Sequence, residues 1–114
     1  MNNFFTIVSQ TSEKEGTYNY EVKLNSQHKV FEGHFPGNPI VPGVMSMMMI
    51  RMLAEETLGR STRYTAVKDC KYLQTIVPDG NIIKVNVTTD GTALSGEILS
   101  SAGEGLMKIK ASIA

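Results

Sequence analysis

The chain has 114 residues and a mass of 12.5 kDa, which predicts one domain spanning residues 1–114 with a hydrophobic core of its own. Eleven Lys and Arg residues balance eleven Asp and Glu residues, and this neutrality argues against a nucleic-acid-binding protein, because such proteins rely on neutralising phosphates. The 41% hydrophobic content argues against disorder, and the one cysteine, Cys70, excludes an internal disulfide framework and a cysteine-rich zinc site.

The first two segments are typical of β-strands. Residues 4–10 form a short apolar run, and residues 17–24 (TYNYEVKL) alternate apolar and polar side chains with the period of two expected for a strand. The polar segment between them ends in Gly16 and is predicted to be a turn.

A loop rich in glycine and proline, residues 31–43 (FEGHFPGNPIVPG), separates these strands from the only predicted helix. Residues 44–58 contain good helix formers and are followed by Gly59 as a C-terminal stop. The first two turns are apolar on almost every side, so we expect other elements to surround this helix. Its apolar stretch, 44–54, spans about 16 Å, too little to cross a bilayer. Because the N-terminal residues also lack a signal peptide, we expect a cytoplasmic protein without membrane contact.

Four further strand-like runs follow the helix. Turn signals stand between them, among them Asp90-Gly91, which is typical of a hairpin. The runs cover residues 64–73, 81–89, 92–100 and 106–114. Two strands, one helix and four strands predict an α+β fold, an antiparallel six-stranded sheet wrapped around one central helix.

His34 is the candidate for proton chemistry. Histidine can take and return a proton near neutral pH, and the prolines of the 31–43 loop would hold His34 in a defined direction. The same loop brings Gly43 to the predicted helix start, where unpaired amides and a partial positive charge favour a polarised carbonyl. The alternative is that His34 packs under the loop with both ring nitrogens satisfied.

Residues 34–44 (HFPGNPIVPGV) resemble the signature of the 3-hydroxyacyl-acyl-carrier-protein dehydratases, the FabA/FabZ group of hotdog-fold enzymes. Residues 71–80 (KYLQTIVPDG) are similar to the strand-and-turn motif that follows the helix in that family. The resemblance implies a hotdog domain, dimers built by joining two sheets edge to edge, and active sites at the dimer interface. It also implies thioester substrates carried by acyl-carrier protein or coenzyme A.

The resemblance assigns roles to individual positions. His34 matches the catalytic histidine that removes the proton next to the thioester carbonyl, and Gly43 matches the glycine whose amide polarises that carbonyl. Val44 would lie beside the same site, and Phe35 and Pro36 would shape the loop next to the substrate. No metal-ligand set and no dinucleotide-binding motif is visible, so no cofactor is expected.

Met48 departs from the family pattern, which places a Glu or Asp at this helix position. A thioether cannot donate a proton, and losing a positioned acid typically costs about 10²- to 10⁴-fold in rate. Three interpretations remain open. The protein is a dehydratase that works without this acid, or an impaired subunit that binds acyl chains or joins an active dehydratase subunit in a hetero-oligomer, or a thioesterase. Met48 and Met52 either line an acyl tunnel or serve only for packing.

Other residues give weaker indications. Cys70 is expected to be buried and inert rather than nucleophilic, and Arg51 is expected to form a structural ion pair with Glu55. A group of basic residues after the helix either forms a rim that attracts an acidic carrier protein or is scattered solubilising charge. Its members are Arg60, Arg63, Lys68 and Lys71.

Overall fold

A computed structural model describes residues 3–32 and 39–114 of the chain. The described residues form six β-strands, one α-helix and one short 3-10 helix. In chain order these are β1 (Phe5–Lys14), β2 (Thr17–Leu24), the 3-10 helix η1 (Lys29–Phe31), α1 (Gly43–Leu58), β3 (Tyr64–Tyr72), β4 (Ile82–Thr89), β5 (Ala93–Leu99) and β6 (Gly105–Ile113). The α+β prediction and all seven predicted elements are confirmed.

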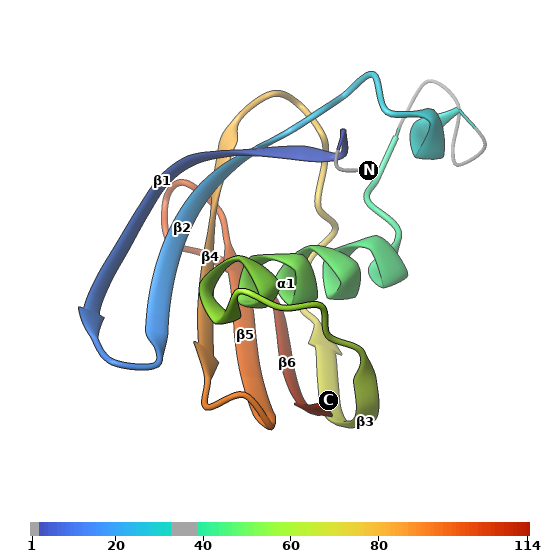
Figure 1. Ribbon diagram of the computed structural model, residues 1–114. Helices are drawn as coiled ribbons and strands as arrows, with labels where there is room; N and C mark the ends of the chain where they lie inside the picture. Colours follow the sequence, from blue (N-terminus) through green and yellow to red (C-terminus); the bar gives the residue numbers. More distant parts are fainter. Residues whose placement is uncertain (1–2, 33–38) are drawn as a thin grey trace.

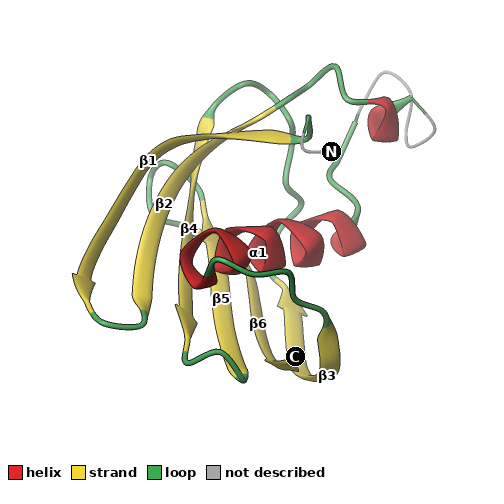
Figure 2. Ribbon diagram, in the orientation of Figure 1, coloured by secondary structure: helices red, strands yellow, loops and turns green. Residues whose placement is uncertain are grey.

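The six strands form one antiparallel sheet in the order β1-β2-β4-β5-β6-β3. The sheet curls around α1, which lies across its concave face (Figures 1 and 2). The strands alternate buried and exposed side chains, most regularly in β4 and β5, because one face of the sheet packs on the helix and the other meets solvent. The strands β1 and β3 are the two edges.

One side of α1 carries the contacts with the sheet. Its buried residues recur at the spacing of a single helix face and are Ser46, Met49, Ile50, Leu53 and Ala54. The helix ends where Gly59 adopts a left-handed conformation (φ 69°) and its N–H donates to the Glu55 carbonyl.

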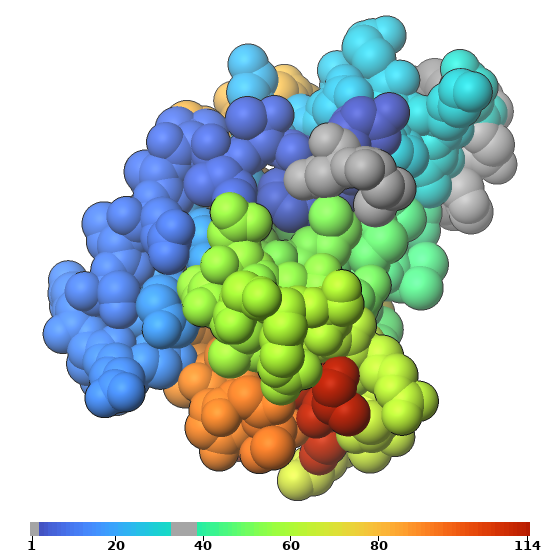
Figure 3. Space-filling view, viewed as in Figure 1, coloured from blue at the N-terminus to red at the C-terminus, as the bar shows by residue number. Residues whose placement is uncertain are grey.

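Most of α1 is covered, as expected for a helix that is apolar on nearly every side. Val44 is the exposed apolar residue of the helix, at 70%, and in the space-filling view the end of α1 and the residues after it stand at the surface, with β1 and β2 beside them (Figure 3). The other apolar residues of α1 are buried or partly buried, and Met45, Met47 and Met52 pack against the core.

Helix and sheet approach each other closely at Gly96 in β5. A Cβ atom added there would lie 2.6 Å from Cγ2 and 3.1 Å from Cδ1 of Ile50, a side chain with no exposed surface. Real Cβ atoms do not approach other atoms so closely. The absence of a side chain at position 96 therefore lets α1 sit this deep in the sheet.

Two tyrosines tie α1 to strands on its two sides. The Tyr20 hydroxyl of β2 donates to the Leu53 carbonyl (3.2 Å), and the Tyr64 hydroxyl of β3 donates to the Met47 carbonyl (2.7 Å). Burial raises the pKa of Tyr20 to about 12 and raises that of Tyr64 further, so both hydroxyls keep their protons at neutral pH.

Two local features differ from the prediction. The first strand extends to Lys14, because its polar residues still pair with β2 although they bury nothing. The 3-10 helix η1 was not predicted. His28 caps it, its Nδ1 accepting from the Val30 N–H at 3.0 Å, and its ring packs edge-on against Phe4.

We predict that Gly96→Ala destabilises the protein by about 1–3 kcal/mol, because the new methyl group overpacks the contact with Ile50. In an Ile50→Ala background the same substitution should cost less, since the clashing atoms are gone. Chemical denaturation of the four variants measures this coupling. Ser95→Ala, an exposed neighbour in β5, should change the unfolding free energy by less than about 0.5 kcal/mol. Equal costs of Gly96→Ala in both backgrounds would contradict the packing argument.

Asp90 stabilises the turn between β4 and β5. Its Oδ1 accepts from the N–H groups of Ala93 (2.8 Å) and Thr92 (2.9 Å) and from the Thr92 hydroxyl, and these bonds lower the pKa of Asp90 to about 2. A carboxyl whose pKa is lowered on folding stabilises the protein above its ordinary pKa and loses this effect as the pH falls through the lowered one. We therefore predict that Asp90→Ala is destabilising at pH 6, and that its difference from the wild type in unfolding free energy shrinks between about pH 4 and pH 2. A difference that stays constant over this range would contradict the assignment.

Candidate active site

The sequence-predicted site is described only in part. His34, Phe35 and Pro36 lie outside the described residues, whereas Gly43 is the first residue of α1. Pro42 is the N-cap and offers no side-chain cap, and its carbonyl accepts from the N–H groups of Met45 and Ser46.

The amides at the start of α1 have no backbone partner among the described residues. Neither Gly43 nor Val44 donates a backbone hydrogen bond to any residue within 3–32 and 39–114. Unpaired amides at a helix N-terminus carry a partial positive charge. They attract an oxygen that gains negative charge during a reaction.

A groove of about 470 Å³ opens beside this helix end. One wall is the segment leading into α1 and the other is the end of β3 with the residues that follow it. The walls are held together because the Val41 N–H donates to the Ile76 carbonyl (2.8 Å), and the second wall is fixed to the sheet because the Leu73 N–H donates to the Leu106 carbonyl (2.9 Å). The lining residues are Ile40, Val41, Gly43, Ser46, Tyr72, Leu73, Gln74, Thr75 and Ile76.

Tyr72 lies against Gly43 across this groove. A Cβ atom added to Gly43 would be 2.7 Å from both Cζ and Oη of Tyr72, which places the phenol hydroxyl within about 4 Å of the Gly43 Cα. Sequence reasoning missed Tyr72 as a site residue, although it stands inside the 71–80 motif. Only the contact between a strand end and a helix start 29 positions earlier reveals its place.

The Tyr72 hydroxyl is protonated at neutral pH. Partial burial, followed by a side-chain hydrogen bond with Cys70, raises the pKa of Tyr72 to about 12. Cys70 is two residues earlier on the same face of β3, is partly buried and is not in a disulfide.

Ser46 adds a second hydroxyl to the groove. It is only 1% exposed and lines the groove. A hydroxyl can donate or accept a hydrogen bond, so it could contact a polar group of a ligand in the groove.

Met48 and Met52 lie on a different side of α1 from the groove. They follow Val44 at intervals of four residues and are partly buried, and Met52 packs against the core. Within one copy of the chain the groove is lined by Ser46 and not by these methionines. Their role in an acyl tunnel stays a prediction that needs a second subunit over this side of the helix.

The nearest helical carboxylate cannot replace the missing acid. Glu55 Oε2 accepts from Arg51 Nη1 (2.9 Å), from the Thr62 N–H (2.6 Å) and from the Thr62 hydroxyl (3.2 Å). The predicted Arg51–Glu55 ion pair is thus confirmed. Glu55 is engaged in joining α1 to the segment before β3.

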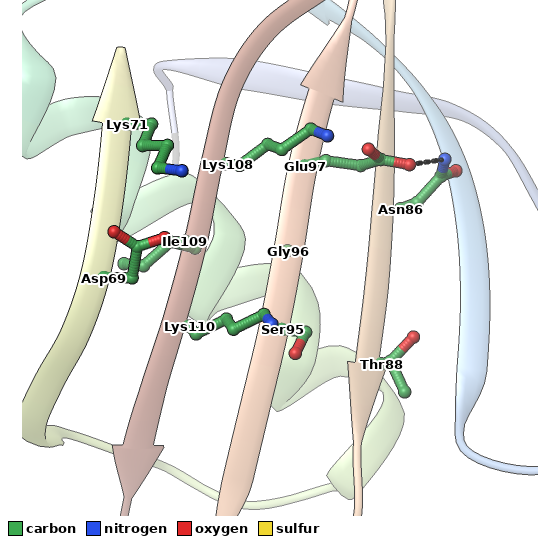
Figure 4. A pocket seen from close by; sticks show the side chains of 10 residues that line it. All are labelled: Asp69, Lys71, Asn86, Thr88, Ser95, Gly96, Glu97, Lys108, Ile109 and Lys110. Carbon is green, nitrogen blue, oxygen red and sulfur yellow. Dashed lines mark hydrogen bonds between the residues drawn. The ribbon is translucent and has the colours of Figure 1, made fainter.

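Asp69 is directed away from the site. It lies with Lys71 and Lys110 on the outer face of the sheet, the face turned away from α1 (Figure 4). On the same face Glu97 accepts from the Asn86 amide at 3.1 Å. These carboxylates are separated from the groove by the sheet itself.

Two of the four basic residues after the helix, Arg60 and Lys71, lie away from the groove. Arg60 donates to the Gly91 carbonyl (2.6 Å) beyond the C-terminal end of α1, about 24 Å along the helix from Gly43. Lys71 follows β3 onto the outer face (Figure 4). Their arrangement favours scattered surface charge.

No group of three or more potential metal ligands occurs among residues 3–32 and 39–114. In the same ranges no helix combines the length and apolar character needed to span a bilayer.

The fold is that of a hotdog protein, and sequence comparison identifies the family. The chain belongs to the ApeI-like family, described as ApeI dehydratase, whose sequence model matches residues 9–102. It is 31% identical over 88 residues to the 3-hydroxyacyl-acyl-carrier-protein dehydratase FabZ of Alkaliphilus metalliredigens (strain QYMF), a match covering 71% of this chain and 58% of that protein. The chain thus spans little more than half the length of this curated relative.

Solved structures confirm the hotdog fold. The dehydratase heterocomplex ApeI:P from Xenorhabdus doucetiae superposes with a TM-score of 0.83 at 17% identity, covering 96% of both chains. A hypothetical thioesterase with coenzyme A from Streptococcus pneumoniae TIGR4 superposes with a TM-score of 0.65 at 11% identity, covering 97% of this chain and 87% of that one. At these identities the likeness concerns the fold alone.

We predict that Gly43→Ala displaces the Tyr72 ring, because the new methyl group would occupy the space of Cζ and Oη. The substitution should be less favourable in the wild type than in a Tyr72→Ala background. In that background it should be neutral or stabilising by up to about 1 kcal/mol, since alanine is the better helix former. Thermal unfolding of the four variants measures the coupling. Additive effects would show that the two residues are not in contact.

Proposed function

We propose that the protein is a dehydratase that removes water from a 3-hydroxyacyl thioester, carried by acyl-carrier protein or coenzyme A, to give a trans-2-enoyl thioester in fatty-acid or polyene-type biosynthesis. The observation that carries this proposal is the unpaired Gly43 amide at the start of α1, opening on a groove, in a chain of the ApeI-like dehydratase family. This amide is suited to a thioester carbonyl.

His34 and Gly43 divide the chemistry. His34 takes the proton from the carbon next to the carbonyl, and the electron pair of that C–H bond moves toward the carbonyl oxygen, which the Gly43 N–H stabilises. The carbonyl then re-forms, the bond from carbon 3 to its hydroxyl breaks, and the hydroxyl leaves as water with the proton that His34 returns. Phe35, Pro36 and Val44 shape the space around the reacting atoms. The step needs no cofactor.

A second subunit completes this site. Val44 of α1 is exposed, Met48 and Met52 on the same side of the helix are partly buried, and the edge strand β3 presents Val67 (45% exposed) and Tyr72 (53% exposed) beside its unpaired backbone. Exposed apolar surface next to an unpaired strand favours association. A homodimer or larger assembly would cover both, bring the methionines of one subunit toward the groove of the other, and place the active sites at the interface.

Met48 favours a second candidate function. No helical acid stands at position 48, and Glu55 is held by Arg51 and Thr62. The chain would then be an impaired hotdog subunit that binds acyl chains or partners an active dehydratase subunit. A thioesterase role has no specific observation in its favour, since the likeness to the streptococcal protein is one of fold.

A mass-spectrometric assay with 3-hydroxyacyl-pantetheine and 3-hydroxyacyl-carrier-protein substrates tests the proposal. We expect the wild type to convert the substrate into a product that is 18 Da lighter through loss of water. His34→Ala should lower the rate of this conversion by about 10²- to 10⁴-fold. His28→Asn is the matched control, because Asn preserves an N-cap at η1, and it should retain the wild-type rate.

Met48→Glu separates the two candidates. Activity in the wild type that depends on His34 supports a dehydratase able to work without the helical acid. An inactive wild type together with an active Met48→Glu variant would contradict that proposal and support the impaired subunit. Turnover unchanged by His34→Ala would show that the catalytic assignment is wrong.

A further inference from the structure

We infer that the Tyr72 hydroxyl is a second hydrogen-bond donor to the thioester carbonyl oxygen, acting beside the Gly43 N–H. This inference rests on the proposed dehydratase function and adds a catalytic residue to it. Neither the 34–44 motif nor the helix position of Met48 includes this residue.

The contact across the groove supports the assignment. The Tyr72 ring closes over the Gly43 Cα, with Oη within about 4 Å of that atom. A carbonyl oxygen that accepts from the Gly43 N–H can therefore lie close to the phenol hydroxyl as well. Donors act on such an oxygen when they lie about 2.7–3.1 Å from it, and two neighbouring donors can meet that condition together.

The groove also holds a second hydroxyl. Ser46 lines it together with Tyr72 and Gly43 and is almost completely buried. A hydroxyl can donate or accept a hydrogen bond, so Ser46 is suited to a polar group of a bound thioester.

The protonation state decides between two roles for Tyr72. The raised pKa of about 12 makes its hydroxyl a poor acid at neutral pH, because an efficient general acid has a pKa near the working pH. The same shift keeps the proton on the oxygen as a donor. The present partner, the Cys70 sulfur, is weak, so the hydroxyl can turn to a stronger acceptor.

Tyr72 therefore keeps its proton throughout the reaction. The base takes the proton from carbon 2, the charge that develops on the carbonyl oxygen is shared by the Gly43 N–H and the Tyr72 O–H, and the base returns its proton to the departing hydroxyl. In this arrangement Tyr72 lowers the barrier to proton removal. It does not replace the acid absent at Met48.

Tyr72→Phe provides the test, because the ring stays against Gly43 and only the hydroxyl is lost. The matched control is Tyr18→Phe, which removes a hydroxyl of β2 near Leu58 at the far end of α1. We expect Tyr72→Phe to lower kcat/KM for 3-hydroxyoctanoyl-pantetheine by about 100-fold and Tyr18→Phe to leave it unchanged. Circular dichroism verifies that both variants fold.

A spectroscopic readout separates hydrogen bonding to the carbonyl from other effects. Isotope-edited infrared spectra are recorded of 2-octenoyl-pantetheine, labelled with ¹³C at the carbonyl, bound to each variant. The carbonyl band of the wild-type complex should move to higher wavenumber in Tyr72→Phe, because one polarising bond is lost, and should not move in Tyr18→Phe.

The outcomes are distinguishable. If the wild type is active and the carbonyl band is unchanged in Tyr72→Phe, the inference is wrong and the dehydratase function stands. If the rate of Tyr72→Phe falls although its carbonyl band does not shift, Tyr72 acts on the departing hydroxyl instead. A wild type without turnover refutes the proposed function. If that protein still binds the enoyl thioester, a band that moves in Tyr72→Phe supports the donor role, and one that does not overturns it.

Discussion

The close contact between Ile50 and Gly96 sets the depth at which α1 lies in the sheet. A methyl group at position 96 would meet Ile50 at 2.6 Å, so the helix axis can approach β5 only because that strand has no side chain there. This depth brings the hydroxyls of Tyr20 and Tyr64 within reach of helix carbonyls on either side. The same depth determines where the first turn of α1 lies relative to the end of β3. The geometry of the groove is thus a consequence of packing at the middle of the helix.

The order and type of the elements could be predicted because they depend on local patterns. Alternation of apolar residues marked the strands, glycine and proline marked the turns, and Gly59 marked the end of the helix. The long motif at 34–44 indicated the family, which the comparisons confirm. The i,i+4 spacing was sufficient to predict the ion pair between Arg51 and Glu55.

The remaining features depend on contacts between distant parts of the chain. Tyr72 looked like one more aromatic residue of a strand, and its place against Gly43 follows only from the register of β3 with β6 and from the position of the helix. Nothing in the sequence around His28 indicates a cap, yet its ring packs against Phe4 and it caps η1 as a partly buried residue. The helix was apolar on nearly all sides in the sequence. In the structure all of its apolar residues except Val44 are buried or partly buried.

The contact between Tyr72 and Gly43 also restricts how this protein can change during evolution. A side chain at position 43 would displace the ring at position 72 from its present place, because both would occupy the same space. A lineage that acquires alanine or serine at 43 therefore gains from a smaller or differently placed residue at 72. Joint variation at these two positions among relatives would therefore record the shape of the groove, even in proteins whose chemistry has been lost.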